Sequence, residues 1–174
     1  MPNQQPIVTS VRGRRFSCSP AAVVGIIVDE AERILLLAHP KNNGAWEVVN
    51  GGLEAEETLL EGALREVHEE AGAQVQVRPL GVIYAGTFHY DDNVQFMISV
   101  NFLFAYEGGP VEPGDDMAGS AYRWWSLDEM RAEQPLIVVP GEDQFWILER
   151  AVQLYRLWRN TPLPTIPHPS GGRN

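Results

Sequence analysis

The sequence predicts an α/β fold in which a mixed sheet is sandwiched between helices. Short apolar runs typical of β-strands recur between residues 21 and 126. Between them the period changes to the helical 3.6 residues at 58–71, and a second helical segment closes the chain at 142–158. Because each helix has an apolar stripe to bury, we expect one helix on either side of the sheet, an α/β/α sandwich.

A chain of 174 residues with 44% apolar and 21% charged residues is typical of one globular domain. We divide it into an N-terminal arm at 1–19, a domain at 20–159 and a flexible proline-rich tail at 160–174. The arm is polar and aperiodic, so we expect a loose segment or an added edge strand. The tail has few apolar residues and should not fold.

The strands follow in order from their composition. The runs at 21–28 and 33–38 are joined by an acidic link and predict a hairpin. The run at 45–49 ends in Asn50-Gly51-Gly52, a turn signal. Further strands are expected at 74–77, 81–89, 94–106 and 121–126. A short helix at 127–132 should begin at Ser126, a favourable N-cap residue.

The helix at 58–71 has two distinct faces. Its apolar stripe consists of Leu60, Ala63, Leu64, Val67 and Ala71, and Gly72 is expected to end it. Glu66, Glu69 and Glu70 share a second face about 120° away. Such like charges cost about 0.2–0.5 kcal/mol per pair, and Arg65 is the neighbouring cation. Oxygen ligands of this kind suit Mg²⁺, although the spacing alone equally describes a solvated acidic face.

The net charge and the cysteine content limit the kinds of binding partner and compartment that we expect. With 13 basic and 23 acidic residues the net charge is -10, which disfavours stable nucleic-acid binding. A phosphate substrate would then need a bound cation as mediator. The single cysteine, Cys18, excludes an intrachain disulfide and is expected to be a small buried hydrophobe. The apolar run at 21–28 is too short to cross a bilayer, so we expect a cytoplasmic protein without a membrane partner.

The stretch from Gly51 to Ala73 carries the most specific signal. Five residues separate Gly51 from Glu57, seven more lead to Arg65, and the sequence then reads REVHEEAGA. It resembles the Nudix box, G-x5-E-x7-R-E-U-x-E-E-x-G-U with U apolar, at every fixed position. A chance match at one site is rarer than about one in 10⁸. The resemblance implies a Nudix fold with a loop–helix–loop metal site, and makes 20–159 a Nudix hydrolase domain.

The entry to the box departs from the commoner Pro-Gly-Gly-x-x-Glu-x-Gly-Glu. Aligned on its two glycines, the chain has Asn50 in place of proline and one residue fewer between Gly52 and Glu54. We therefore expect a shortened entry loop. The last apolar position is Ala73 rather than a larger residue, which is a minor change.

The resemblance also implies roles for the residues of the box. Glu66 and Glu70 would bind the metal, Glu69 would complete the set, and a carbonyl of Gly51 or Gly52 would add an oxygen. Glu57 would support these ligands or bind a further metal, although it could simply stabilise the helix N-terminus. Arg65 would pair with and orient the carboxylates, and we group it with the catalytic residues. The cofactor implied is Mg²⁺, with Mn²⁺ as the alternative.

The expected reaction is cleavage of a pyrophosphate bond. Divalent cations neutralise and orient the phosphates, and a carboxylate takes the proton of the attacking water. Glu69 or Glu66 could act as this base. In some family members the base comes from a later loop, which makes Glu112, Asp115 and Asp116 alternatives unless that loop is merely solvated.

The substrate is a nucleoside diphosphate linked to another moiety: a nucleotide, a dinucleoside polyphosphate or a nucleotide sugar. Tyr90, about 17 positions beyond the box, resembles a tyrosine of the dinucleoside polyphosphate hydrolases and could stack on a base. His39 could contact phosphate, and Trp46 could stack on a base or belong to the core. The alternative function is a catalytically impaired nucleotide-binding module or regulator. Many Nudix enzymes are dimers, which leaves a homodimer open.

Overall fold

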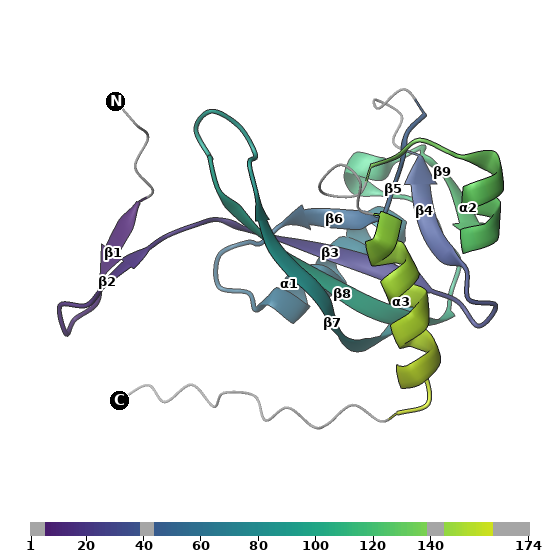
Figure 1. Ribbon diagram of the computed structural model, residues 1–174, viewed down its shortest axis with the longest axis horizontal. Helices are drawn as coiled ribbons and strands as arrows, with labels where there is room; N and C mark the ends of the chain where they lie inside the picture. Colours follow the sequence, from purple (N-terminus) through teal and green to yellow (C-terminus); the bar gives the residue numbers. More distant parts are fainter. Residues whose placement is uncertain (1–5, 39–43, 139–144, 162–174) are drawn as a thin grey trace.

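A computed structural model describes residues 6–38, 44–138 and 145–161. A mixed sheet forms the body of the molecule, and a separate two-stranded hairpin extends from one end of it (Figure 1). The path through the main sheet is β10-β5-β4-β3-β8-β7, with β6 also paired to β3 and β9 to β4. These strands are β3 (Ala21–Val28), β4 (Ile34–Ala38), β5 (Trp46–Glu47), β6 (Val49–Gly52), β7 (Gln76–Phe88), β8 (Met97–Gly108), β9 (Ala121–Trp125) and β10 (Ile137–Val138).

The central strand β3 pairs in parallel with β8 over its whole length and antiparallel with β6. Its side chains alternate between two buried layers, as a strand covered on both faces requires. Val24, Ile26 and Val28 belong to one layer, and Val23 and Ile27 to the other. The predicted pairing of β3 with β4 is confirmed but short, at Val28 and Ile34, because β4 pairs mainly with β9.

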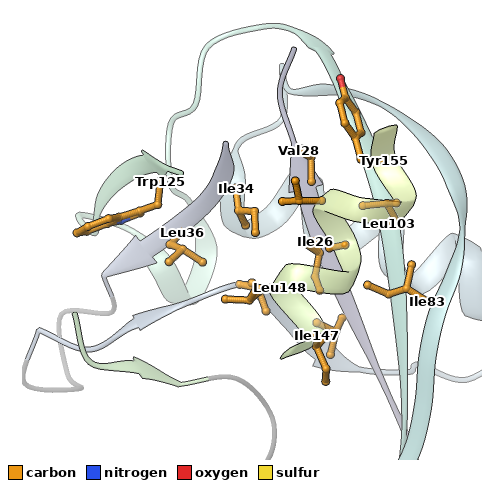
Figure 2. Close-up of a cluster of buried hydrophobic side chains, with 14 of the residues drawn as sticks. Ile26, Val28, Ile34, Leu36, Ile83, Leu103, Trp125, Ile147, Leu148 and Tyr155 are labelled. Atoms are coloured by element: carbon orange, nitrogen blue, oxygen red, sulfur yellow. The ribbon is translucent and has the colours of Figure 1, made fainter. Parts of the chain in front are cut away.

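Helices cover both faces, which confirms the predicted layers. One layer lies beneath α3 (Phe145–Trp158), where Ile147 and Leu148 pack with Ile26 and Ile83 (Figure 2). The other lies beneath α1 (Leu59–Glu66), whose Ala63 packs with Phe104. A third helix, α2 (Leu127–Glu133), begins at the predicted cap Ser126 and adds Met130 to the α3 layer.

The predicted helix at 58–71 is a composite. Thr58 caps α1 in a reciprocal capping box with Glu61, and α1 passes directly into a π-helical turn, η1 (Val67–Ala71). Single π-turns inside helices rotate the following side chains out of α-helical register. Gly72 follows with φ +126°, and a β-carbon there would meet the Glu112 backbone at 2.9 Å. The stop at Gly72 therefore needs glycine both for its dihedral angle and for space.

Several expectations are wrong in detail. Asn50-Gly51-Gly52 is not a turn but part of β6, paired with β3. The strands predicted at 74–77 and 81–89 form one strand, β7, which passes Pro79 with register shifts against β8. The described part of the N-terminal arm is not an edge strand of the main sheet, because β1 (Ile7–Thr9) and β2 (Arg15–Ser17) pair with each other. Cys18 is exposed rather than buried.

The tail expected at 160–174 lies outside the described residues from 162 onward. Likewise the first residues of the helix expected at 142–158 fall outside them, and α3 is described from Phe145. Of the described helices, none combines the length and the apolar character needed to cross a membrane.

Candidate metal and nucleotide site

Arg65 joins three of the predicted acidic residues. Its Nε and Nη2 bind both carboxylate oxygens of Glu57 at 3.1 and 2.9 Å, and its Nη1 binds Glu66 and Glu69 at 2.8 Å each. Nη2 also donates to the Gly52 carbonyl at 2.9 Å. The fork of an arginine suits this multiple pairing, which lowers the pKa of Glu57. Arg65 thus ties the helix to β6 and to the loop between them.

Glu66 and Glu70 are buried, and when both are ionised they carry more negative charge than Arg65 balances. Burial raises the pKa of Glu66 despite its pairing with Arg65. Burial also raises the pKa of Glu70 to about 8, while the Asn50 N–H, which donates to Glu70 at 2.9 Å, opposes that rise. The strongest charges acting on Glu70 are those of Glu66, Glu47 and Asp116, all of the same sign. A cation beside Glu66 and Glu70 would relieve both the burial cost and the repulsion.

Gly51 lies where β6 touches this acidic helix. A β-carbon on Gly51 would fall 2.0 Å from Glu66 Oε1, so glycine is required for the carboxylate to lie against the strand. The Gly52 carbonyl is bound by Arg65, so of the two glycines Gly51 has the carbonyl that Arg65 does not engage. The Asn50 side chain donates to the Val48 carbonyl at 2.9 Å, whereas its backbone N–H donates to Glu70. The exchange of proline for asparagine therefore preserves the strand beside the helix.

The later acidic loop packs against the end of the helix. The N–H groups of Glu112 and Gly114 cap the carbonyls of Ala71 and Glu70 at 2.9 and 3.3 Å. A short 3₁₀ turn, η2 (Asp115–Met117), follows, and its Met117 is buried in the α1 layer. This contact brings Asp116 close enough to influence Glu70. The loop is therefore part of the site region rather than a remote solvated segment.

The donor set fits a hard divalent cation. All its members are oxygens, from Glu66, Glu69, Glu70 and the Gly51 carbonyl, and Mg²⁺ prefers such ligands. Within the described residues, no three Asp, Glu, His or Cys side chains are gathered as ligands of one ion. Glu66 and Glu69 point to Arg65, and Glu70 to Asn50. Holding a cation with several of these carboxylates therefore requires side-chain rotation.

A cavity of about 330 Å³ opens on the other side of β6. It is lined mainly by apolar side chains and by the glycines of β6, and Tyr90 stands at its border. Its lining residues are Ala22, Val24, Glu47, Asn50, Gly51, Gly52, Phe88, Tyr90, Met97, Ser99 and Val138. A cavity at the low end of the range for small-molecule sites suits one ring system and its sugar. The structure thus places a cavity and the acidic helix on either side of one short strand.

The three residues expected to bind substrate are placed differently. Tyr90 lines the cavity and contacts Phe88 edge to face, with ring centroids 6.4 Å apart. Trp46 packs instead on the α3 layer and meets Trp125 at 5.4 Å, so its core interpretation holds. His39 lies outside the described residues. Glu47 was not predicted, since nothing distinguishes it within the short run at 45–49.

A family model described as the NUDIX domain matches residues 19–151. The chain belongs to the Nudix family. The acidic helix with its entry strand is therefore the Nudix box of this chain, as its sequence pattern predicted.

Comparison with individual proteins supports this assignment. The chain is 34% identical over 111 residues to the NAD-capped RNA hydrolase NudC of Vibrio parahaemolyticus, covering 63% of this chain and 40% of that protein. It is 41% identical over 109 residues to a MutT-like protein of Streptomyces ambofaciens, covering 63% and 65%. The chain thus spans less than two thirds of these relatives' lengths. A crystal structure of an ADP-ribose pyrophosphatase from Streptococcus suis shares the Nudix fold, with TM-score 0.63, 22% identity and coverage of 80% and 93%.

Proposed function

We propose that this Nudix protein hydrolyses the pyrophosphate bond of a nucleoside diphosphate linked to another moiety. The observation that carries the proposal is the pair of buried carboxyl groups of Glu66 and Glu70 next to Gly51. When ionised, this pair has more negative charge than the neighbouring positive charge balances. Buried like charges persist when a function requires them. The neighbouring cavity offers room for a nucleoside beside that pair.

The residues of the box take distinct parts in the proposed reaction. Glu66, Glu69, Glu70 and the Gly51 carbonyl would hold the divalent cation, Mg²⁺ or Mn²⁺. When bound, that ion would neutralise the pyrophosphate and stabilise the leaving phosphate. Arg65 orients Glu66 and Glu69 through its two 2.8 Å hydrogen bonds. Glu57 fixes Arg65 from the opposite side, and so acts through it.

Two carboxylates, Glu69 and Asp116, are our candidates for the general base that takes the proton of the attacking water. Glu69 is more exposed than Glu57, Glu66 and Glu70, with a side chain 41% accessible, so water can reach it. Asp116 lies on the loop packed against Glu70 and is the second candidate. The structure favours Asp116 over Glu112 and Asp115, because Asp116 is the loop residue whose charge acts on Glu70.

A substrate panel tests the proposal. Wild-type protein is incubated with nucleotide sugars, deoxynucleoside triphosphates, dinucleoside polyphosphates and NAD, with Mg²⁺ or with EDTA. We expect Mg²⁺-dependent release of mononucleotide or phosphate from at least one of them, and its loss in Glu69→Gln and Glu70→Gln. Glu149→Gln is the matched control, since Glu149 pairs with Arg131 on the surface, outside the site. No metal-dependent product from any compound would overturn the proposal.

The alternative, an impaired nucleotide-binding module, rested on the altered entry at Asn50. Its structural basis is weakened, because the Asn50 backbone binds Glu70 while its side chain turns away. Metal-dependent nucleotide binding without turnover in the same panel would favour it. A cytoplasmic location and a homodimer stay predictions from the sequence.

A further inference from the structure

The hairpin of β1 and β2 has an uncovered apolar face. Val8 and Phe16 are strand partners, so their side chains project to the same side. They are 54% and 47% exposed, and every residue of the two strands is exposed. Within the described residues these strands pair only with each other, and they extend away from the main sheet (Figure 1). Because an isolated two-stranded hairpin is at best marginally stable in water, a stable one needs a surface to pack against.

The same hairpin is the basic end of an acidic chain. Arg12 and Arg14 lie in its turn, and Arg15 begins β2. The Arg14 guanidinium lies 5.0 Å from the centre of the Phe16 ring, so positive charge borders the apolar face. The hairpin has no acidic residue, since all 23 acidic residues of the chain lie from Asp29 onward. The hairpin therefore suits a surface that is both apolar and acidic.

A surface of this composition lies at the turn that joins β7 to β8. Tyr90 and Phe96 are 63% and 53% exposed there, on either side of Asp91 and Asp92. The Asp91 Oδ1 accepts two backbone N–H groups of the turn, at 2.7 and 2.6 Å, and so fixes its shape. Exposed aromatic side chains next to polar groups are typical of protein contact sites. The turn thus complements the hairpin in both apolar surface and charge.

The hairpin and this turn leave the main sheet at the same end. The Ile98 N–H, near the start of β8, donates to the Pro20 carbonyl at 2.9 Å, and Ile98 faces Ala21, where β3 begins. From this common base the two diverge within one chain (Figure 1). Two copies related by a twofold axis can place each hairpin on the turn of the other, so that both contacts form together and the assembly closes.

We propose that the chain forms a symmetric dimer in which the hairpin of each copy packs on the β7–β8 turn of the other. The Val8–Phe16 face covers the exposed aromatic side chains of the turn, and the arginines pair with Asp91 and Asp92. A nucleic acid or an anionic membrane would also attract the arginines, but either would repel the acidic remainder of the chain. A second copy is the partner that satisfies both the apolar face and the arginines.

Sedimentation equilibrium of the full chain tests the dimer. Wild-type protein should have twice the 19.4 kDa mass of one chain. Arg14→Glu and Asp92→Arg should each raise the dissociation constant of the dimer at least about tenfold, because each places like charges at both contacts. Arg150→Glu is the matched control, since it makes the same charge change at an exposed residue of α3. A monomeric wild-type chain, or an undiminished dimer in Arg14→Glu, would overturn the proposal.

Mixing the two variants shows whether hairpin and turn contact each other. In a dimer with one copy of each variant, the reversed hairpin meets the reversed turn and the native hairpin meets the native turn. Both contacts then join opposite charges, so the equimolar mixture should dimerise with nearly wild-type affinity. Such recovery also shows that both variants are folded. If each variant is weakened and their mixture stays monomeric, the two surfaces are not partners and the proposal fails.

The competing partners are tested with the same proteins. The probes are a single-stranded oligonucleotide and vesicles of phosphatidylcholine with phosphatidylserine. A monomeric wild-type chain that binds either probe, with binding lost in Arg14→Glu, would assign the hairpin to that partner and overturn the dimer. Mass rather than hydrolysis is the measured quantity because Tyr90 also borders the cavity. The dimer therefore stands or falls independently of the proposed reaction.

Discussion

Arg65 and Arg123 each bind several carboxylates, and the two clusters differ in charge balance. Arg123 on β9 binds Glu133 at 2.7 and 2.8 Å and Glu129 at 3.1 Å, and lies 3.7 Å over the Trp125 ring. These contacts are partly exposed. The Ser126 backbone and hydroxyl, then Arg123, lower the pKa of Glu129 to about 2. The Arg123 cluster is a surface ion-pair network that favours its charged state.

The Arg65 cluster has the opposite property at its buried end. Arg65 serves three carboxylates, and Glu70 adds a fourth that is bound only by a backbone N–H. Burial there raises the pKa of Glu66 and Glu70 instead of lowering it. An acidic cluster that serves stability lowers carboxylate pKa values, whereas raised pKa values make the ionised carboxylates costly, a cost that a bound cation would offset.

Removal of the Glu70 charge should have the largest effect on function. Glu70→Gln should lower Mg²⁺-dependent hydrolysis at least about 100-fold, since even residues that only support metal ligands are worth 10- to 100-fold. In EDTA the variant should unfold at the same or a higher temperature, because a neutral amide avoids the burial cost. Glu129→Gln in the Arg123 cluster should leave the rate unchanged. Equal rate losses in the two variants would remove the distinction between the clusters.

The two clusters should respond to pH in opposite directions. The folded pKa of Glu70 is about 8, above the ordinary 4.5, so the metal-free folded chain keeps a proton that the unfolded chain loses. This contribution to stability is complete below pH 4.5 and is lost as pH rises through about 8. Glu129, with its pKa near 2, contributes above its ordinary value and loses that contribution as pH falls toward 2.

Urea unfolding in EDTA between pH 4 and 9 measures the first trend. Glu70→Gln should flatten it, whereas Glu129→Gln should not. A wild-type stability that rises across this range would show that Glu70 is ionised in the folded, metal-free chain.

Replacement of the two arginines compares the clusters directly. Arg65→Leu should lower the free energy of unfolding by about 2–3 kcal/mol, because it leaves the buried Glu66 and the partly buried Glu57 unpaired. Arg123→Leu should lower the free energy of unfolding less than Arg65→Leu does, since the partners of Arg123 stay solvated. Chemical denaturation at neutral pH measures both. The comparison fails if Arg123→Leu is the more damaging change.

The smallest effects concern the helix caps beside each cluster. Thr58 caps α1 and Ser126 caps α2, each in a reciprocal capping box. Either change to alanine should cost about 1 kcal/mol. Only Thr58→Ala should also weaken Mg²⁺ binding, because α1 carries the acidic residues. Titration calorimetry would show this, and an equal loss in Ser126→Ala would point to a global effect.

The elements with a long local period were predictable from the sequence. The helix at 58–71 was found from its stripe, its acids and Gly72, because all of these depend on neighbouring residues. Its π-turn was not, since it results from tertiary contacts such as the loop at Glu112 and Gly114, which caps the helix end. The same holds for the side-chain directions: Glu69 turns to Arg65 and Glu70 to Asn50.

The errors lie where long-range pairing overrides a local signal. The sequence Asn50-Gly51-Gly52 is typical of a turn, yet Gly51 allows the close approach of Glu66, and Gly52 pairs with Ala22 of β3. The place of Ser99 at the cavity could not be predicted, because it depends on the pairing of β8 with β3 and β7, whose register no local pattern encodes.

The short strand β6 limits how this region can change in length. Its residues alternate between the two faces of the sheet. Gly51 faces the acidic helix, whereas Asn50 and Gly52 face the cavity. One residue inserted or deleted within β6 would exchange these faces, since the side-chain period of a strand is two. An insertion that moved Asn50 into the place of Gly51 would bring a β-carbon into the space of the Glu66 carboxylate. A change in chain length is therefore excluded from the four residues of β6.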